Sequence, residues 1–144
     1  SLNSVFQKVL KNLEVLVTES NAKIIYPSFP NVIGSESMLI QLFQNLLNNA
    51  LKFRKKEVIP EITVSFDEKE TYVEFMIHDN GIGIAEEDQN QIFQIFTRLH
   101  TRKDYPGNGI GLAVCEKIIA RHKGRIWVES KPGEGSSFYF TLNK

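Results

Sequence analysis

Three polar side chains on one predicted helix carry the first candidate chemistry. At about 100° per residue, Asn49 lies roughly 40° and Lys52 roughly 20° from Asn45 around the helix axis, so the three form one narrow stripe. Amide oxygens suit a Mg²⁺ ion already held by phosphates, because they add a hard ligand without adding negative charge. The alternative is an ordinary solvated helix face, although asparagine lowers helix propensity.

The segment DNGIGI at 79–84 is the second candidate. Gly81 and Gly83 allow a close backbone approach to a ligand. Asp79 stands at the predicted end of a strand, where its carboxylate can accept a hydrogen bond from an exocyclic amine such as that of adenine. The alternative for this segment is an ordinary Asn-Gly turn with a local side-chain cap, which would be preferred if no other motif pointed to a ligand.

Two further glycine-containing segments point to phosphate. GNGIGLAV at 107–114 runs into a predicted helix, and backbone amides at a helix start favour an anion. Its spacing fits neither the P-loop nor the dinucleotide fingerprint. In GEGSSF at 133–138, Ser136 or Ser137 could donate to a phosphate, with a hairpin turn as the alternative.

The hydrophobic pattern predicts the elements that position these residues. Helices are expected over 4–21, from a Ser35 or Ser37 cap to about Phe53, and from about Gly109 to a C-terminal cap at Gly124. A short apolar helix is expected at 92–96. Strands are expected at 22–26, 61–66, 71–78, 125–130 and 136–142. This pattern predicts a two-layer α/β sandwich, with about three long helices over a mixed five-stranded sheet.

Composition narrows the class of protein. A chain of 144 residues that is 42% hydrophobic is expected to form a single domain, spanning residues 1–144, with a sizeable core. Seventeen basic residues balance seventeen acidic ones, which removes the simplest argument for nucleic acid or an anionic membrane as partner. The single cysteine, Cys115, excludes an internal disulfide and favours a reducing, cytoplasmic compartment. A start at Ser1 suggests a piece of a longer protein.

The order of the motifs is more specific than any one of them. NLLNNALKF, DNGIGI, IFQIF, GNGIGL and GEGSSF resemble the N box, first glycine box, F box, second glycine box and third glycine box of the catalytic ATP-binding domain of sensor histidine kinases. The resemblance covers essentially the whole chain and implies the Bergerat-type ATP-binding fold. The stretch RLHTRKDYPGNGIGLAVCEKI is especially similar to phytochrome-like sensor kinases.

The resemblance assigns a role to each matching residue. Asn49 would bind magnesium, Asn45 would support the same site, and Lys52 would contact phosphate. Asp79 would read the adenine amino group. The remaining expected nucleotide contacts are Gly81, Gly83, Phe96, Gly109, Gly111, Leu112 and Ser137. Residues 97–108 would form a lid over the nucleotide, with Phe93 and Phe96 at its base.

The implied reaction is transfer of the ATP γ-phosphoryl group, with Mg²⁺, to a histidine on a separate dimerisation domain. A response regulator is the expected downstream partner. Gyrase-like, Hsp90-like and MutL-like relatives carry a glutamate that activates water where Asn45 stands. Because an amide cannot take a proton at neutral pH, ATP hydrolysis as the main reaction is disfavoured. None of His78, His100 and His122 lies in the acceptor pattern. Rival hypotheses are a serine kinase or slow ATPase on the same fold, and a nucleotide-sensing module that transfers nothing.

Three other features have simpler interpretations. Cys115, inside the third predicted helix, is expected to be a buried inert thiol. His122, near the end of that helix, is expected to interact as a cation with the helix dipole. The basic residues that follow Lys52 close a helix, where cations are favourable.

The predicted lid yields the first test. Residues 97–108 have no apolar periodicity and carry Arg98, Arg102 and Lys103, so little is expected to hold them without phosphate charge. In hydrogen exchange their amides should be unprotected in the free domain and gain protection with Mg-ATP, while amides of 112–119 change little. Equal, strong protection in both states would contradict gating by this segment.

Overall fold

A computed structural model describes residues 1–85, 89 and 111–144 of the chain. The predicted short helix at 92–96, the predicted lid at 97–108, and Phe93, Phe96 and Gly109 lie outside the described residues. None of the helices in the described part of the chain is long and apolar enough to cross a membrane.

Five strands form one mixed sheet, as predicted. They are β1 (Lys23–Ile25), β2 (Glu61–Glu68), β3 (Tyr72–Asp79), β4 (Ile126–Ser130) and β5 (Ser136–Asn143). Their order across the sheet is β1-β2-β3-β5-β4. Only the β1–β2 pair is parallel, and the other three pairs are antiparallel. This order places β3 in the middle of the sheet, with β5 beside it.

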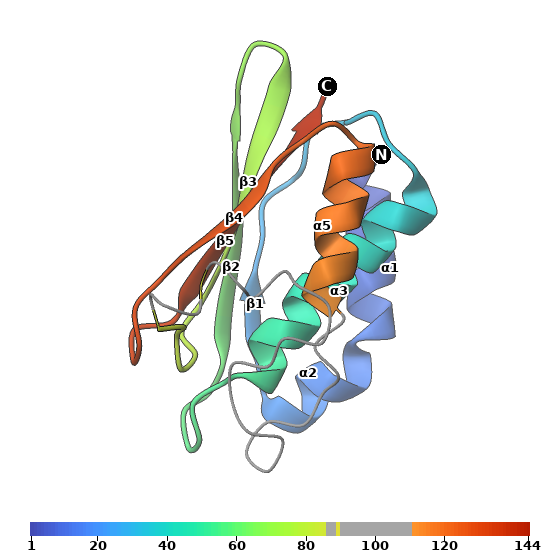
Figure 1. Ribbon diagram of the computed structural model, residues 1–144. Coiled ribbons are helices and arrows are strands. Elements are labelled where there is room, and N and C mark those ends of the chain that lie inside the picture. Colours follow the sequence, from blue (N-terminus) through green and yellow to red (C-terminus); the bar gives the residue numbers. More distant parts are fainter. Residues whose placement is uncertain (86–88, 90–110) are drawn as a thin grey trace.

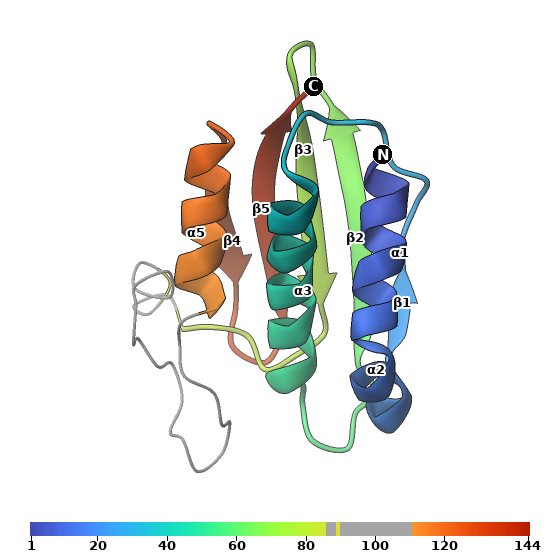
Figure 2. The ribbon, with the colours of Figure 1, turned by 90° about the vertical axis from the view of Figure 1, so that its right-hand side faces the viewer.

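The helices cover one face of this sheet, which confirms the two-layer sandwich (Figures 1 and 2). They are α1 (Leu2–Asn12), α2 (Glu14–Ser20), α3 (Glu36–Lys52) and α5 (Gly111–Arg121). In Figure 2, α3 lies between α1 and α5. The central helix therefore touches a neighbour on each side and the sheet beneath it.

The single helix predicted over 4–21 is wrong, because the structure breaks it into α1 and α2 at Leu13. Leu13 has φ −99° and ψ 6°, which departs from helical values. It remains 3% exposed, whereas Val15 and Leu16, just beyond it, are 68% and 40% exposed. The break keeps Leu13 in the core while α2 presents apolar residues to solvent.

The predicted start of α3 is confirmed. Ser35 caps the helix, and its Oγ accepts a hydrogen bond from the Met38 N–H at 3.4 Å. The buried face of α3 comprises Leu39, Leu42, Phe43, Leu46, Leu47, Ala50 and Leu51, and Phe53 is half-buried at the helix end. These residues recur at helical spacing because one side of α3 faces the sheet.

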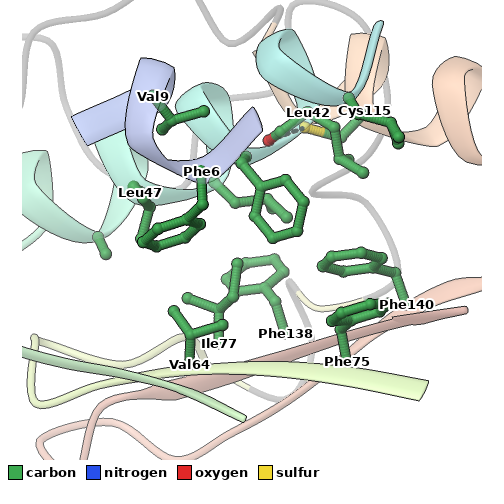
Figure 3. Packing of buried hydrophobic residues seen from close by; sticks show 14 of the residues in the cluster. Phe6, Val9, Leu42, Leu47, Val64, Phe75, Ile77, Cys115, Phe138 and Phe140 are labelled. Atoms are coloured by element: carbon green, nitrogen blue, oxygen red, sulfur yellow. Dashed lines mark hydrogen bonds between the residues drawn. The ribbon is translucent and has the colours of Figure 1, made fainter. Parts of the chain in front are cut away.

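Aromatic rings join α3 to β3 and β5. Figure 3 labels the two strand rings, Phe75 and Phe140. Phe75 on β3 stacks on Phe140 on β5 with centroids 5.0 Å apart. Phe43 of α3 meets both edge-on, at 6.1 Å and 5.4 Å. Offset and edge-to-face contacts of this kind are the favourable arrangements of aromatic pairs. The cluster fixes the height and rotation of α3 over β3, which matters for the site below.

The sequence predicts a C-terminal cap of α5 at Gly124, but in the structure the left-handed residue of this cap is the one before it. Gly124 N–H bonds the Ile119 carbonyl at 3.0 Å and Lys123 N–H bonds the Ala120 carbonyl at 3.0 Å, which is a Schellman motif. Lys123, with φ 58°, takes the left-handed position, not Gly124. A Cβ on Gly124 would lie 2.1 Å from the Thr141 carbonyl oxygen. Gly124 is therefore needed for close approach to β5.

The predicted charge–dipole role of His122 is wrong. Its Nε2 accepts a hydrogen bond from the Ser35 backbone N–H at 3.1 Å, so that nitrogen carries no proton. Nδ1 lies 2.7 Å from the Ile118 carbonyl and must be the donor. Only the neutral ring satisfies both contacts. His122 therefore connects the end of α5 to the start of α3 as a hydrogen-bonding group.

These two positions at the end of α5 make opposite predictions. Lys123→Gly should raise the free energy of unfolding by about 1 kcal/mol, because it relieves a left-handed non-glycine residue. Gly124→Ala should lower it by roughly 1–3 kcal/mol or more, because the methyl group would collide with β5. Urea unfolding of both variants checks the pair. A stabilised Gly124→Ala variant would contradict this packing.

Candidate functional site

A small cavity of about 30 Å³ lies where the end of α3 meets the carboxyl end of β3, the start of α5 and the start of β5. It is lined by Asn49, Ala50, Phe53, Asp79, Ile82, Gly83, Ile84, Leu112, Ser136 and Phe138. Four residues predicted from the sequence, Asn49, Asp79, Gly83 and Leu112, therefore meet here from three segments of the chain. The structure brings the N box and the first glycine box to one place.

Asp79 is the charged group of this cavity. It is 8% exposed, and its Oδ1 accepts a hydrogen bond from the Gly81 N–H at 2.8 Å. Burial raises the pKa of the Asp79 carboxyl above its ordinary value, while the N–H groups of Gly81 and Ser136 and the neighbouring His78 oppose the shift. A carboxylate in such surroundings is a strong acceptor for an N–H group, since solvent does not compete for it.

Asn80 holds the loop that follows Asp79, a role that sequence reasoning missed. Its Oδ1 accepts from the Glu61 N–H at 2.9 Å, and its Nδ2 donates to the Ile59 carbonyl at 3.1 Å. The side chain thus ties the end of β3 to the start of β2. Asparagine side chains often hydrogen-bond nearby backbone groups, which could have indicated this role, but the partner strand is not evident from the sequence.

At each of the two glycines of DNGIGI, another segment of the backbone packs so closely that a side chain would collide with it. A Cβ on Gly81 would lie 2.6 Å from the Phe53 carbonyl oxygen, which accepts a hydrogen bond from the Ile82 N–H at 3.1 Å. Gly83 has φ 77°, and a Cβ there would lie 2.1 Å from the Lys131 carbonyl oxygen. Gly83 lines the cavity, whereas Gly81 positions the loop against the end of α3.

The polar stripe of α3 divides between different surroundings. Asn49 is half-buried and lines the cavity. Asn45 is half-buried, and its side chain hydrogen-bonds the Cys115 thiol of α5. Lys52 is exposed and lines a separate, larger groove on the side of α2. Side chains within one 60° sector can thus face different neighbours, because α3 is packed on both flanks.

Cys115 is the buried thiol that was predicted. It is fully buried, and its Sγ–H donates to the Leu42 carbonyl at 3.8 Å (Figure 3). Burial raises the pKa of the Cys115 thiol to about 12, and the hydrogen bond from Asn45 opposes this shift. A thiol held in its neutral form is a poor nucleophile.

The serines of the third glycine box point to opposite faces of β5. Ser136 pairs with Asp79 across the ladder, is 5% exposed and lines the cavity. Ser137 pairs with His78, and its Oγ lies 2.8 Å from His78 Nδ1 on the other face. The structure therefore brings Ser136 rather than the predicted Ser137 to the cavity. The second glycine box contributes Leu112 in the first turn of α5, directly after Gly111.

Comparison with known proteins assigns the family. The family described as histidine kinase-, DNA gyrase B- and HSP90-like ATPase matches residues 34–144. The chain belongs to this family. All residues that line the cavity lie within the matched range. The predicted resemblance to the catalytic domain of sensor histidine kinases is thereby confirmed.

Curated relatives agree with this family. Cyanobacterial phytochrome A of Nostoc sp. is 49% identical over 135 residues, which cover 94% of this chain and 18% of the relative. An adaptive-response sensory kinase SasA of Prochlorococcus marinus is 45% identical over 114 residues, covering 78% of this chain and 30% of the relative. The chain thus spans less than a fifth of the phytochrome it matches and under a third of the kinase.

Solved structures confirm the fold. The mycobacterial sensor histidine kinase MprB superposes with a TM-score of 0.83 at 25% identity, covering 99% of this chain and 93% of that structure. The catalytic domain of histidine kinase ThkA, in a nucleotide-free form, superposes with a TM-score of 0.82 at 26% identity, covering 99% and 92%. The two-layer sandwich is therefore that of histidine kinase catalytic domains.

The buried carboxyl of Asp79 predicts a pH-dependent cost to stability. Its folded pKa lies above the ordinary value of 3.8, so ionised Asp79 destabilises the folded state increasingly as pH rises from below 3.8 through the folded pKa. The Asp79→Asn variant lacks this ionisation. Its free energy of unfolding, relative to the wild type, should therefore rise from acidic to neutral pH.

Denaturant unfolding across that range measures the difference. Asp67→Asn is the matched control, because Asp67 lies on the same sheet with its side chain 68% exposed. A difference between Asp79→Asn and wild type that stays constant with pH would contradict the raised pKa.

Proposed function

We propose that this domain binds Mg-ATP through the cavity at the end of α3 and presents the γ-phosphoryl group to a histidine supplied by a separate dimerisation domain. The observation that carries the proposal is the meeting of Asp79 and Asn49 on one cavity within this family fold. Phosphoryl transfer needs little covalent chemistry from the protein, so positioning and electrostatics are sufficient roles for these groups.

Asp79 would accept the amino hydrogen of adenine. The apolar lining from Ile82, Ile84 and Phe138 suits a flat aromatic base, and the carboxylate supplies the one specific acceptor at its edge. The cavity as it stands is small, so we expect the base to widen it on entry.

Asn49 would supply an amide oxygen to Mg²⁺, whose other ligands would be phosphate oxygens and water. The donor fits, because Mg²⁺ prefers oxygen ligands and Asn49 lines the cavity from the helix side. When bound, the ion would neutralise charge on the transferred phosphoryl group. Lys52, one turn further along α3, would reach phosphate from the outer side, and amides at the start of α5 would complete the anion site.

Neither of the two described histidines, His78 and His122, lines the cavity. His122 uses both ring nitrogens, and His78 bonds Ser137 on the face away from the cavity. Asn45 is an amide bonded to Cys115. The two described histidines are thus not placed to accept the phosphoryl group, and an amide at Asn45 cannot act as the base for hydrolysis, which supports an acceptor histidine on another domain.

The proposal includes the setting of the domain. Residues 1–144 would act as one unit, because buried residues of α1 belong to the same core cluster as those of the sheet. The unit would work in the cytoplasm within a longer sensor protein, and its product would pass the phosphoryl group to a response regulator.

Radiolabelled ATP tests the reaction. The domain is mixed with a helical-hairpin domain that carries an acceptor histidine, and with the same hairpin after a His-to-Gln change. We expect acid-labile, base-stable label on the first hairpin only. Label on serine, or release of inorganic phosphate without labelled hairpin, would overturn the proposal in favour of a serine kinase or an ATPase.

Asn49→Asp should weaken binding of Mg-ATP although it offers the same kind of oxygen. An added carboxylate beside three phosphates repels the nucleotide and alters the coordination of the ion. Calorimetry with Mg²⁺ and a non-hydrolysable ATP analogue measures the affinity.

Gln44→Glu is the matched control for charge on α3. Gln44 Oε1 accepts from Asn12 at 3.1 Å, a contact that glutamate retains, and Gln44 does not line the cavity. If both variants lose affinity equally, or neither does, Asn49 is not a ligand.

A further inference from the structure

A second concavity, separate from the Asp79 cavity, lies between α2 and the chain that follows α3. Its volume is about 680 Å³. It is lined by Leu16, Glu19, Ser20, Asn48, Leu51, Lys52, Arg54, Lys55, Lys56, Glu57, Val58 and Ile59, which we call the α2 groove. In Figure 2, α2 and the segment leaving α3 lie together at one end of the molecule.

The α2 groove contains a buried acceptor without a donor. Asn48 lines it, and Asn48 Oδ1 is the one buried side-chain oxygen or nitrogen in residues 1–85, 89 and 111–144 that has no hydrogen-bond partner. Buried polar atoms in folded proteins are nearly always satisfied, because an unmet acceptor has lost its water without compensation. This oxygen can therefore accept a hydrogen bond from an N–H or O–H group that enters the α2 groove.

The rim of the α2 groove is basic. The lining contains four cations, Lys52, Arg54, Lys55 and Lys56, and two carboxylates, Glu19 and Glu57, whereas the charges of the whole chain balance. None of these four cations forms an ion pair with a described carboxylate. A favourable interaction with the C-terminus of α3 accounts for Lys52 only, since that effect fades beyond the last turn.

Apolar side chains complete the α2 groove. Leu16, Val58 and Ile59 are 40%, 43% and 64% exposed, and Val15 beside Leu16 is 68% exposed. An apolar centre within a charged rim is the usual anatomy of a protein–protein contact. A concavity of about 680 Å³ is large enough to receive a short peptide segment.

We propose that the α2 groove docks an acidic segment of a partner protein. An apolar side chain of that segment would cover Leu16 and Val58, its carboxylates would pair with Arg54 and Lys55, and an N–H group would bond Asn48 Oδ1. A lipid surface matches the charge and the apolar character, but it is flat, whereas a peptide segment can enter the concavity and bring a backbone N–H to Asn48 Oδ1. Half-exposed apolar groups and a charged rim are typical of contacts that form and dissociate, which fits a separate partner.

The probe is a short fluorescent peptide of glutamate, glycine and leucine, with a control peptide in which lysine replaces every glutamate. We expect the acidic peptide to bind the domain, the basic one not to bind, and affinity to fall as salt is added. In NMR titration, shifts should be confined to residues 16–20, 48 and 52–59.

Two variants test the named contacts. Arg54→Glu combined with Lys55→Glu should weaken the peptide about tenfold or more, whereas the same reversal at Lys11 and Lys117, exposed on α1 and α5, should change affinity little. Asn48→Leu removes the unpartnered oxygen. It should leave thermal stability equal or higher and still weaken peptide binding.

Other outcomes would overturn the docking proposal. Absence of acidic-peptide binding, NMR shifts centred on the Asp79 cavity, or equal losses from both pairs of reversals would each exclude the α2 groove as the docking site. Binding to phosphatidylglycerol vesicles that is lost in the Arg54 and Lys55 variant, with no peptide binding, would assign the surface to a membrane. Unchanged affinity for an ATP analogue in all variants separates this result from the proposed function.

Discussion

The site depends on one constraint, a carboxylate held at the end of a central strand in apolar surroundings. Asp79 is buried without an ion-pair partner among the described residues, so its charge is held by backbone N–H groups. A Cβ on Gly135 would lie 2.0 Å from the Asp79 carbonyl oxygen, so the β4–β5 turn closes tightly over this position. The Asn80 side chain ties the residue after Asp79 to the start of β2 through hydrogen bonds with Glu61 and Ile59. The domain thereby retains an acceptor that costs stability when unbound.

Helix α3 links that constraint to the rest of the fold. Phe43 sets its position on Phe75 and Phe140, and this position decides that Asn49 meets the cavity while Asn48 turns to the α2 groove. His122 and Ser35 then fix the far end of α3 against α5. One helix therefore serves the core, the nucleotide cavity and a second surface, and a small rotation would disturb all three.

Sequence predicted what local patterns determine. Asn49 and Asp79 could be placed from helix periodicity and from the end of a strand, and the ordered boxes then supplied the fold. Ser137 shows the limit, because strand residues alternate between faces and only the pairing of Ser136 with Asp79 reveals which serine faces inward.

Other features depend on tertiary contacts that no local pattern records. His122 bonds Ser35, which is 87 positions away. Lys123 is left-handed beside Gly124, which packs against Thr141 of β5, and the break at Leu13 keeps that residue in the common core. The α2 groove escaped prediction for the same reason, since α2 and the irregular segment after α3 have no shared pattern.

The central claim is that buried Asp79 reads the adenine amino group. Competition between ATP and GTP for the wild type and for Asp79→Asn tests it most directly. An amide can turn a donor toward the amino group, and loss of a charge-assisted hydrogen bond costs roughly 1.5–3 kcal/mol, so preference for ATP should fall by about tenfold or more. An undiminished preference in the variant would contradict the claim and remove Asp79 as the reader of the base.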